Sequence, residues 1–166
     1  MIVGKNSQKG AIFTVTLPIK AQTDKEVKFP VRKDYDLKGL RLLLVEDEVG
    51  IAESCHELLT AKGCQVTTAF TIKDAMQAIQ EDRFDIVVMD FKMPGEMSGI
   101  QFYDWMVSYL PVIRDKIILM TGDTLSPEYR TFMEKSHVPV ITKPFRFNAF
   151  IEKIGITAKR VGLLEV

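Results

Sequence analysis

The sequence predicts an α/β fold with a doubly wound, five-stranded parallel sheet. From residue 40 onward, five short apolar runs alternate with segments in which apolar residues recur at helical spacing. Strands that alternate with helices are joined by crossovers, which makes the sheet parallel and places helices on both of its faces. A chain of 166 residues with 46% hydrophobic residues is long enough to bury such a core.

The five expected strands lie at residues 40–45, 64–70, 85–90, 116–121 and 138–142. The first, third and fourth are nearly continuous apolar runs, as in strands that are buried on both faces, so we expect them at the centre of the sheet. The second alternates between polar and apolar residues and the fifth contains Pro139, so both suit the edges. These features predict the strand order 2-1-3-4-5.

The helices are expected between these strands. Gly63 is a suitable stop for the first helix and Pro111 for the third, while Ser126-Pro127 is a favoured helix start near the beginning of the fourth. The apolar spacing predicts helices at residues 51–62, 72–79, 100–110, 125–133 and 147–154.

The first 38 residues follow a different pattern. Residues 11–19 alternate and are rich in β-formers, which predicts a strand that ends at Pro18. Ile2-Val3 is the candidate partner strand of a β-hairpin, because a polar turn separates the two segments. Residues 20–38 are polar and charged and lack periodicity, so we expect a linker there.

Composition excludes several classes of protein. Residues 1–38 carry 8 basic and 4 acidic side chains, but the basic ones are scattered, so we expect no nucleic-acid partner. No apolar run approaches the roughly 20 residues of a membrane span, and no signal peptide is visible. Cys55 and Cys64 lack metal-type spacing and are expected to be buried, reduced thiols of a cytoplasmic protein.

Polar side chains with complementary chemistry occur at four of the expected strand ends. Glu46 and Asp47 follow the first strand, Asp90 ends the third, Thr121 ends the fourth and Lys143 follows the fifth. The carboxyl ends of parallel strands meet at one edge, where three carboxylates would repel one another unless a cation lay among them. Oxygen ligands favour Mg²⁺, and a carboxylate nucleophile with Mg²⁺, a lysine and a hydroxyl can form and hold an aspartyl phosphate.

This arrangement resembles the receiver domain of two-component response regulators over residues 39–155, with residues 156–166 as a C-terminal tail. The resemblance implies that Asp90 is the phosphoacceptor, that Thr121 is the switch hydroxyl and that Lys143, before Pro144-Phe145, is the site lysine. It also implies a cis bond before Pro144 and a histidine kinase domain or histidine phosphotransfer protein as the phosphoryl donor. The metal ligands that it implies are Glu46, Asp47, Asp90 and the backbone carbonyl of Lys92.

Three departures from the family pattern bear on regulation. Val140 stands where the family usually has an aromatic switch residue, so the usual output mechanism is in question. The loop of residues 93–99 has one residue more than the common pattern. Lys92 and Asp123 each lie two residues after a site residue, and we expect them to form an ion pair that screens the phosphoryl group from water.

Residues 10–18, Gly-Ala-Ile-Phe-Thr-Val-Thr-Leu-Pro, resemble the end of a histidine-kinase ATP-binding domain. Residues 1–19 are therefore interpreted as a remnant of that domain, and the whole chain as the C-terminal receiver of a cytoplasmic segment of a hybrid kinase. This interpretation allows a parent kinase that is anchored in a membrane. We expect no direct membrane contact of this chain and no output domain after residue 155. We expect residues 11–17 to pair with a hairpin partner, with the receiver, or with a second copy as a homodimer.

Several alternatives stay open at this stage. The chain could be an interaction module whose phosphorylation does not matter, which Val140 favours. A phosphohydrolase of the haloacid dehalogenase type would need an Asp at position 92, and a flavodoxin-like FMN binder would need a phosphate loop after the first strand. Glu46-Asp47-Glu48 could cap the first helix, and His56 is expected to be an ordinary helix histidine.

Overall fold

The computed structural model describes residues 2–5, 11–14 and 35–165, which fall into two separate units. In the first unit, β1 (Ile2–Lys5) pairs antiparallel with β2 (Ala11–Thr14), and Ile2 lies opposite Thr14. The predicted hairpin is therefore confirmed for these residues. The rest of the strand predicted at residues 11–19, and the linker residues before Tyr35, lie outside the described residues.

The second unit contains a parallel sheet of five strands: β3 (Arg41–Val45), β4 (Gln65–Ala69), β5 (Ile86–Asp90), β6 (Ile117–Thr121) and β7 (Val140–Thr142). Their order is β4-β3-β5-β6-β7, which is the predicted order 2-1-3-4-5. Every residue of β5 and β6 is buried, whereas β4 has exposed positions. The predicted contrast between central and edge strands is thus confirmed.

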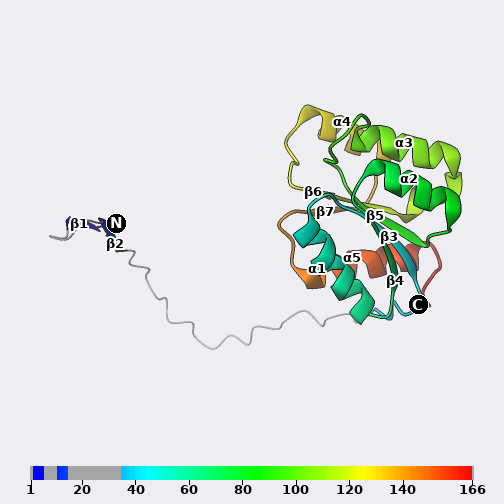
Figure 1. Cartoon of the computed structure of the whole chain (residues 1–166), viewed down its shortest axis with the longest axis horizontal. Helices are drawn as coiled ribbons and strands as arrows, with labels where there is room; N and C mark the ends of the chain where they lie inside the picture. The colour runs from blue at the N-terminus through cyan, green and yellow to red at the C-terminus, as the bar shows by residue number, and fades with distance from the viewer. Residues whose placement is uncertain (1, 6–10, 15–34, 166) are drawn as a thin grey trace. The chain divides into compact units, whose positions relative to one another are not determined.

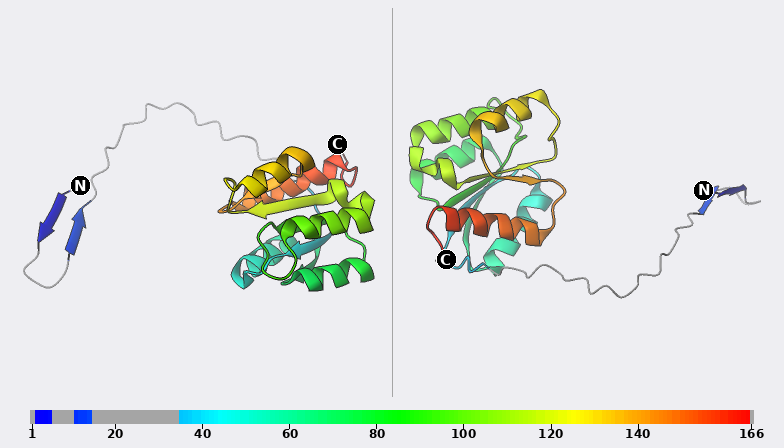
Figure 2. Two further views of the ribbon diagram at one scale, coloured as in Figure 1. Left: turned by 90° about the horizontal axis from the view of Figure 1, so that it is seen from above. Right: turned by 180° about the vertical axis from the view of Figure 1, so that it is seen from behind.

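Helices cover both faces of the sheet (Figure 1, Figure 2). One face carries α1 (Val49–Ala61) and α5 (Phe147–Arg160), and the other carries α2 (Ile72–Glu81), α3 (Gly99–Tyr109) and α4 (Pro127–Ser136). A short 3-10 helix, η1 (Pro111–Lys116), links α3 to β6. None of the helices in the described part of the chain is long and apolar enough to cross a membrane.

Helix starts agree with the capping chemistry of the sequence. The Ser98 hydroxyl accepts the Gln101 N–H while the Gln101 side chain accepts the Ser98 N–H, a capping box that fixes the start of α3. Ser126 caps α4 by accepting the Tyr129 N–H, with Pro127 at the first helical position. Because α3 follows β5 and α4 follows β6, each through a loop, both helices begin at the edge where the strands end.

Two predicted domain boundaries need correction. The linker was expected to run to residue 38, but Tyr35 and Leu37 are buried in the core between the sheet, α1 and α5. The tail was expected to begin at residue 156, but α5 continues to Arg160 and buries Ala158 in the same core. The two segments meet where the Tyr35 ring lies against Gly155, because an added Cβ there would come within 2.1 Å of the ring.

Candidate functional site

Three carboxylates meet at the edge formed by the carboxyl ends of the strands. Glu46 and Asp47 directly follow β3, and Asp90 is the last residue of the neighbouring strand β5. One carboxylate oxygen from each residue lies within 4.8 Å of the others. Glu46 is fully buried, Asp90 is 6% exposed and Asp47 is half-buried. The parallel topology therefore brings together the acidic residues that the sequence singled out.

Lys143 joins two of these carboxylates. Its Nζ donates hydrogen bonds to Oε2 of Glu46 and to Oδ2 of Asp90, and both distances are 2.7 Å. Lys143 follows β7 and precedes Pro144 through a cis peptide bond, as the resemblance implied. A single ammonium group thus bridges two buried carboxylates, which is the pairing that buried charges require.

Burial and the hydrogen bond between them shift the pKa values of Glu46 and Lys143. Burial raises the pKa of Glu46 above its ordinary value, although the hydrogen bond and the charge of Lys143 oppose that rise. For Lys143, burial by itself would lower the pKa, but the hydrogen bonds from its ammonium group to Asp90 and Glu46 outweigh it and the pKa is raised. The lysine is therefore cationic at neutral pH.

Asp47 is the carboxylate that is left without such a partner. Within residues 35–165, no hydrogen bond or ion pair to its side chain is present. A half-buried carboxylate beside two others, all offering oxygen atoms, is a donor set that fits a hard divalent cation such as Mg²⁺. The acidic cluster also adjoins a pocket of about 370 Å³ that Asp47, Lys92, Ser98 and Glu128 help to line.

The hydroxyl of Thr121 is directed elsewhere in this structure. Thr121 ends β6 and is fully buried, beside the strand that carries Asp90. Its Oγ1 donates to the backbone carbonyl of Asp123 and accepts the Asp123 N–H, both at 3.1 Å. The sequence places this residue at the site edge, but it does not reveal that the following loop already uses both hydrogen-bonding functions of the hydroxyl.

The predicted pair of Lys92 and Asp123 is present, with Lys92 Nζ 2.8 Å from Asp123 Oδ2. The hydrogen bond to Asp123 raises the pKa of Lys92, and the hydrogen bond from Lys92 lowers the pKa of Asp123. The Lys92 backbone N–H also donates to Asp90 Oδ1 at 3.0 Å. The loop after β5 is therefore tied both to Asp90 and to the loop after β6.

Comparison with known proteins agrees with this geometry. The family model of the response regulator receiver domain matches residues 42–155. The chain belongs to the response regulator receiver family. The receiver fold is also found in the receiver domain protein of Methanospirillum hungatei JF-1, with 26% identity and a TM-score of 0.67 over 75% of this chain and 97% of that one. The receiver domain of a Francisella response regulator gives 25% identity and a TM-score of 0.63 over 74% and 98%.

Curated relatives are longer proteins. The transcriptional regulatory protein DltR of Streptococcus agalactiae is 29% identical over 130 residues, which are 75% of this chain and 54% of that protein. The transcription factor SKN7 of Saccharomyces cerevisiae is 29% identical over 108 residues, which are 65% of this chain and 17% of SKN7. The chain thus spans about half or less of the length of these relatives.

Several features of this receiver were not foreseen from the sequence. Glu128 lines the pocket beside Asp47, and Phe91 packs its ring against α4 directly after Asp90. Gly99 is required because an added Cβ would lie 2.2 Å from the carbonyl oxygen of Phe91, where the loop returns to β5. The Ser98-x-x-Gln101 capping pattern was the signal in the sequence that could have indicated the start of α3 at Gly99.

The structure also bears on the alternatives. Glu48 occupies the cap position of α1, but its side chain makes no capping hydrogen bond, so helix capping does not account for the acidic run. His56 Nδ1 lies 3.0 Å from Thr68 Oγ1, which is an ordinary contact between α1 and β4. Cys55 and Cys64 are free and buried, as predicted, and burial raises the pKa of each thiol to about 11.

Proposed function

We propose that this receiver is a phosphoacceptor that takes a phosphoryl group from a phosphohistidine onto Asp90 with Mg²⁺. The observation that carries the proposal is the arrangement around Asp90: Lys143 bridges it to Glu46, while Asp47 lies within 4.8 Å without a cationic partner. A lysine and a metal site beside one carboxylate are what phosphoryl transfer to that carboxylate requires.

Each residue has a proposed role in the transfer. A carboxylate oxygen of Asp90 attacks the phosphorus, the new P–O bond forms, and the P–N bond to the donor histidine breaks. The leaving imidazole nitrogen keeps the bonding electron pair and takes up a proton. Lys143 moves from the Asp90 carboxylate to a phosphoryl oxygen, and the Thr121 hydroxyl turns from Asp123 to donate to another.

When bound, Mg²⁺ supplies positive charge to the phosphoryl oxygens. Asp47, Asp90 and the backbone carbonyl of Lys92 would hold it, with Glu46 beside them.

The donor and the setting are also proposed. The donor is a histidine kinase domain or a histidine phosphotransfer protein, and the resemblance of residues 10–18 supports a hybrid kinase as the parent protein. Acceptance of a phosphoryl group from such a donor, together with two reduced thiols, supports a cytoplasmic location. Pairing of the N-terminal strand with a second copy, and the absence of a nucleic-acid partner, stay predictions.

The experiment is phosphorylation with acetyl phosphate, a small donor, followed by intact-mass measurement and peptide mapping. The wild-type chain is expected to gain one phosphoryl group on Asp90 with Mg²⁺ and none with EDTA. Asp90→Asn should abolish the gain, whereas Asp115→Asn, which alters an exposed carboxylate on η1, should keep it. A folded wild-type chain that is not labelled, or that is labelled at another residue, would refute the proposal.

A second candidate is an interaction module that does not depend on phosphorylation. Val140 favours it, because this half-buried aliphatic side chain replaces the aromatic residue usual in the family. The same labelling experiment discriminates between the two, since the module predicts that acetyl phosphate with Mg²⁺ adds no phosphoryl group to Asp90.

A further inference from the structure

A set of aromatic rings connects the strand of Asp90 to two helices. Phe91 follows Asp90 directly and is 6% exposed. Its ring lies edge-on to Tyr129 at 5.6 Å between centroids and 5.8 Å from the ring of Phe132. Phe132 in turn meets Tyr103 edge-on at 5.0 Å. These four residues, called the ring set below, lead from β5 through α4 to α3.

A second connection runs from the site to the start of α4. The backbone of Asp123 holds the Thr121 hydroxyl, and Asp123 Oδ1 accepts the N–H groups of Leu125 and Ser126. Ser126 is the cap of α4 and holds Tyr129, a member of the ring set. Removal of the Thr121 hydroxyl from this loop would therefore free the backbone of Asp123, the residue whose side chain holds the first turn of α4.

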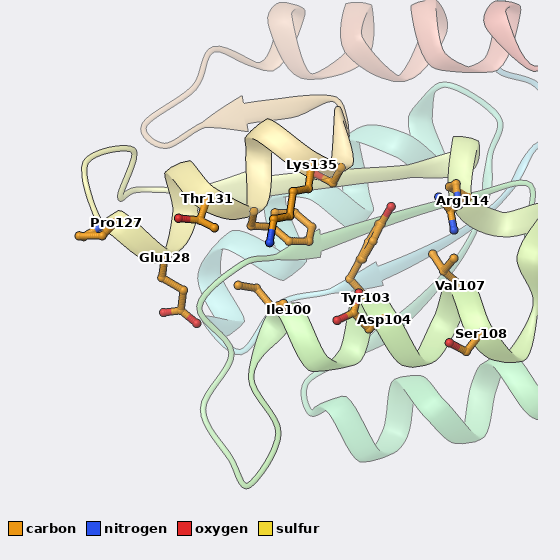
Figure 3. A pocket seen from close by; sticks show the side chains of 12 residues that line it. Ile100, Tyr103, Asp104, Val107, Ser108, Arg114, Pro127, Glu128, Thr131 and Lys135 are labelled. Atoms are coloured by element: carbon orange, nitrogen blue, oxygen red, sulfur yellow. The ribbon is translucent and has the colours of Figure 1, made fainter.

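Both connections converge on a groove between α3 and α4. The groove has a volume of about 680 Å³, and Ile100 and Tyr103 of α3 face Thr131 and Lys135 of α4 across it (Figure 3). Tyr103 and Phe132 belong both to its lining and to the ring set. A displacement of α4 relative to β5 must therefore change the packing of these two rings and the width of the groove.

The side chain at position 140 provides no comparable connection from the site to the α3–α4 groove. Val140 lies on β7 and packs against the same core cluster as the ring set. It has no ring and no polar atom in its side chain, so it cannot follow the Thr121 hydroxyl as an aromatic switch residue would. The ring contacts within residues 35–165 that start beside Asp90 are those of Phe91.

We propose that phosphorylation of Asp90 is read out at the α3–α4 groove, through the Thr121–Asp123 loop and the ring set, and independently of the side chain at position 140. The inference rests on the proposed function. When the Thr121 hydroxyl turns to the phosphoryl group, the backbone of Asp123 is freed, and the first turn of α4, which the Asp123 side chain holds, moves with it. Tyr129 and Phe132 then move against Phe91, and Tyr103 follows on α3.

The four tyrosines of the chain provide the test, because Tyr103 and Tyr129 belong to the ring set while Tyr35 and Tyr109 do not. The chain is labelled with 3-fluorotyrosine and its ¹⁹F NMR spectrum is recorded with Mg²⁺, before and after addition of beryllofluoride, a phosphoryl mimic. Resonances are assigned with Tyr→Phe variants. The Tyr103 and Tyr129 resonances are expected to shift and the Tyr35 resonance to stay in place.

Phe91→Leu should reduce the Tyr103 shift by at least half while beryllofluoride still binds. Phe84→Leu is the matched control, because Phe84 is similarly buried (7% exposed) in the same core cluster but precedes β5 at its other end. It should leave the Tyr103 shift unchanged, and so should Val140→Ala. If Phe91→Leu does not fold, the wild-type chain still provides a test, because the Tyr103 resonance must shift with beryllofluoride while the Tyr35 resonance stays in place.

The ¹⁹F resonances of bound beryllofluoride distinguish failure of this inference from failure of the proposed function. If beryllofluoride binds and the Tyr103 resonance does not shift, the inference is overturned and the proposed function stays intact. Loss of the Tyr103 shift in Val140→Ala also overturns it. The absence of bound beryllofluoride in the folded wild-type chain refutes the proposed function and, with it, the inference.

Discussion

The two edges of the parallel sheet contrast in what they bury. At the carboxyl edge lie Glu46, Asp90 and Thr121, three of the four polar or charged residues that are buried in the described part of the chain. At the opposite edge, Tyr35 and Leu37 enter the apolar core between α1 and α5. Burial of a large apolar side chain contributes about 2–3 kcal/mol, whereas buried charges cost free energy unless they are paired.

The apolar edge therefore contributes to the stability of the fold, whereas the carboxyl edge holds the groups proposed for phosphoryl transfer. The segment around Tyr35 and Leu37 adds apolar contacts at the edge opposite the carboxylates. The edge with the carboxylates keeps charges that are only partly compensated, because Lys143 bridges two of them and Asp47 has no cation. Substitutions at the two edges should therefore separate phosphoryl chemistry from folding.

Lys143→Met is expected to have the largest effect. It leaves Glu46 and Asp90 buried without their cation, which should lower the free energy of unfolding by about 4 kcal/mol in EDTA. Mg²⁺ should restore part of this loss, because a metal ion can take the place of the ammonium group among the carboxylates. Urea unfolding with EDTA and with Mg²⁺ measures both effects, and Lys73→Met, at an exposed position on α2, is the control.

The same variant should show a characteristic pH dependence in EDTA. The pKa of Glu46 is already raised by burial, and the loss of Lys143 removes the interactions that oppose this rise. A carboxyl group with a raised pKa in the folded state binds its proton more tightly there than in the unfolded chain. Stability therefore falls as the pH rises from about 4.5 through the raised pKa. The deficit relative to the wild type should be larger at pH 8 than at pH 5, and a constant deficit would contradict this account.

Tyr35→Ala tests the opposite edge and should have a somewhat smaller effect. It removes a ring that is 7% exposed and packed on Gly155, which should cost about 3 kcal/mol of unfolding free energy. Labelling of Asp90 by acetyl phosphate should persist under conditions in which the variant is folded. Tyr109→Ala is the matched control, because Tyr109 is 49% exposed at the end of α3. A variant as stable as the wild type would show that Tyr35 is not part of the core.

The contrast between the edges also explains what could be predicted from the sequence. Strand order and the gathering of Glu46, Asp90 and Lys143 follow from local patterns, because apolar runs define strands and parallel strands align their ends. The burial of Tyr35 has no local signal, since it depends on Gly155, 120 positions further along the sequence. The orientation of the Thr121 hydroxyl depends on the loop around Asp123, which no periodicity describes.

The smallest expected effect concerns the ion pair of Lys92 and Asp123 at the mouth of the site. Both side chains are partly exposed, 64% for Lys92 and 30% for Asp123, so the pair is screened and its contribution is modest. If it shields the phosphoryl group from water, Lys92→Ala and Asp123→Ala should each speed up the loss of phosphate by about two- to fivefold.

The lifetime of phosphorylated Asp90 can be followed by intact mass after removal of the donor. Because Asp123 also holds the start of α4 through Leu125 and Ser126, Asp123→Ala should have the larger effect of the two. Lys73→Ala should leave the lifetime unchanged. Equal lifetimes in all variants would show that the pair does not control the approach of water, and the role of Asp123 would then be confined to holding α4.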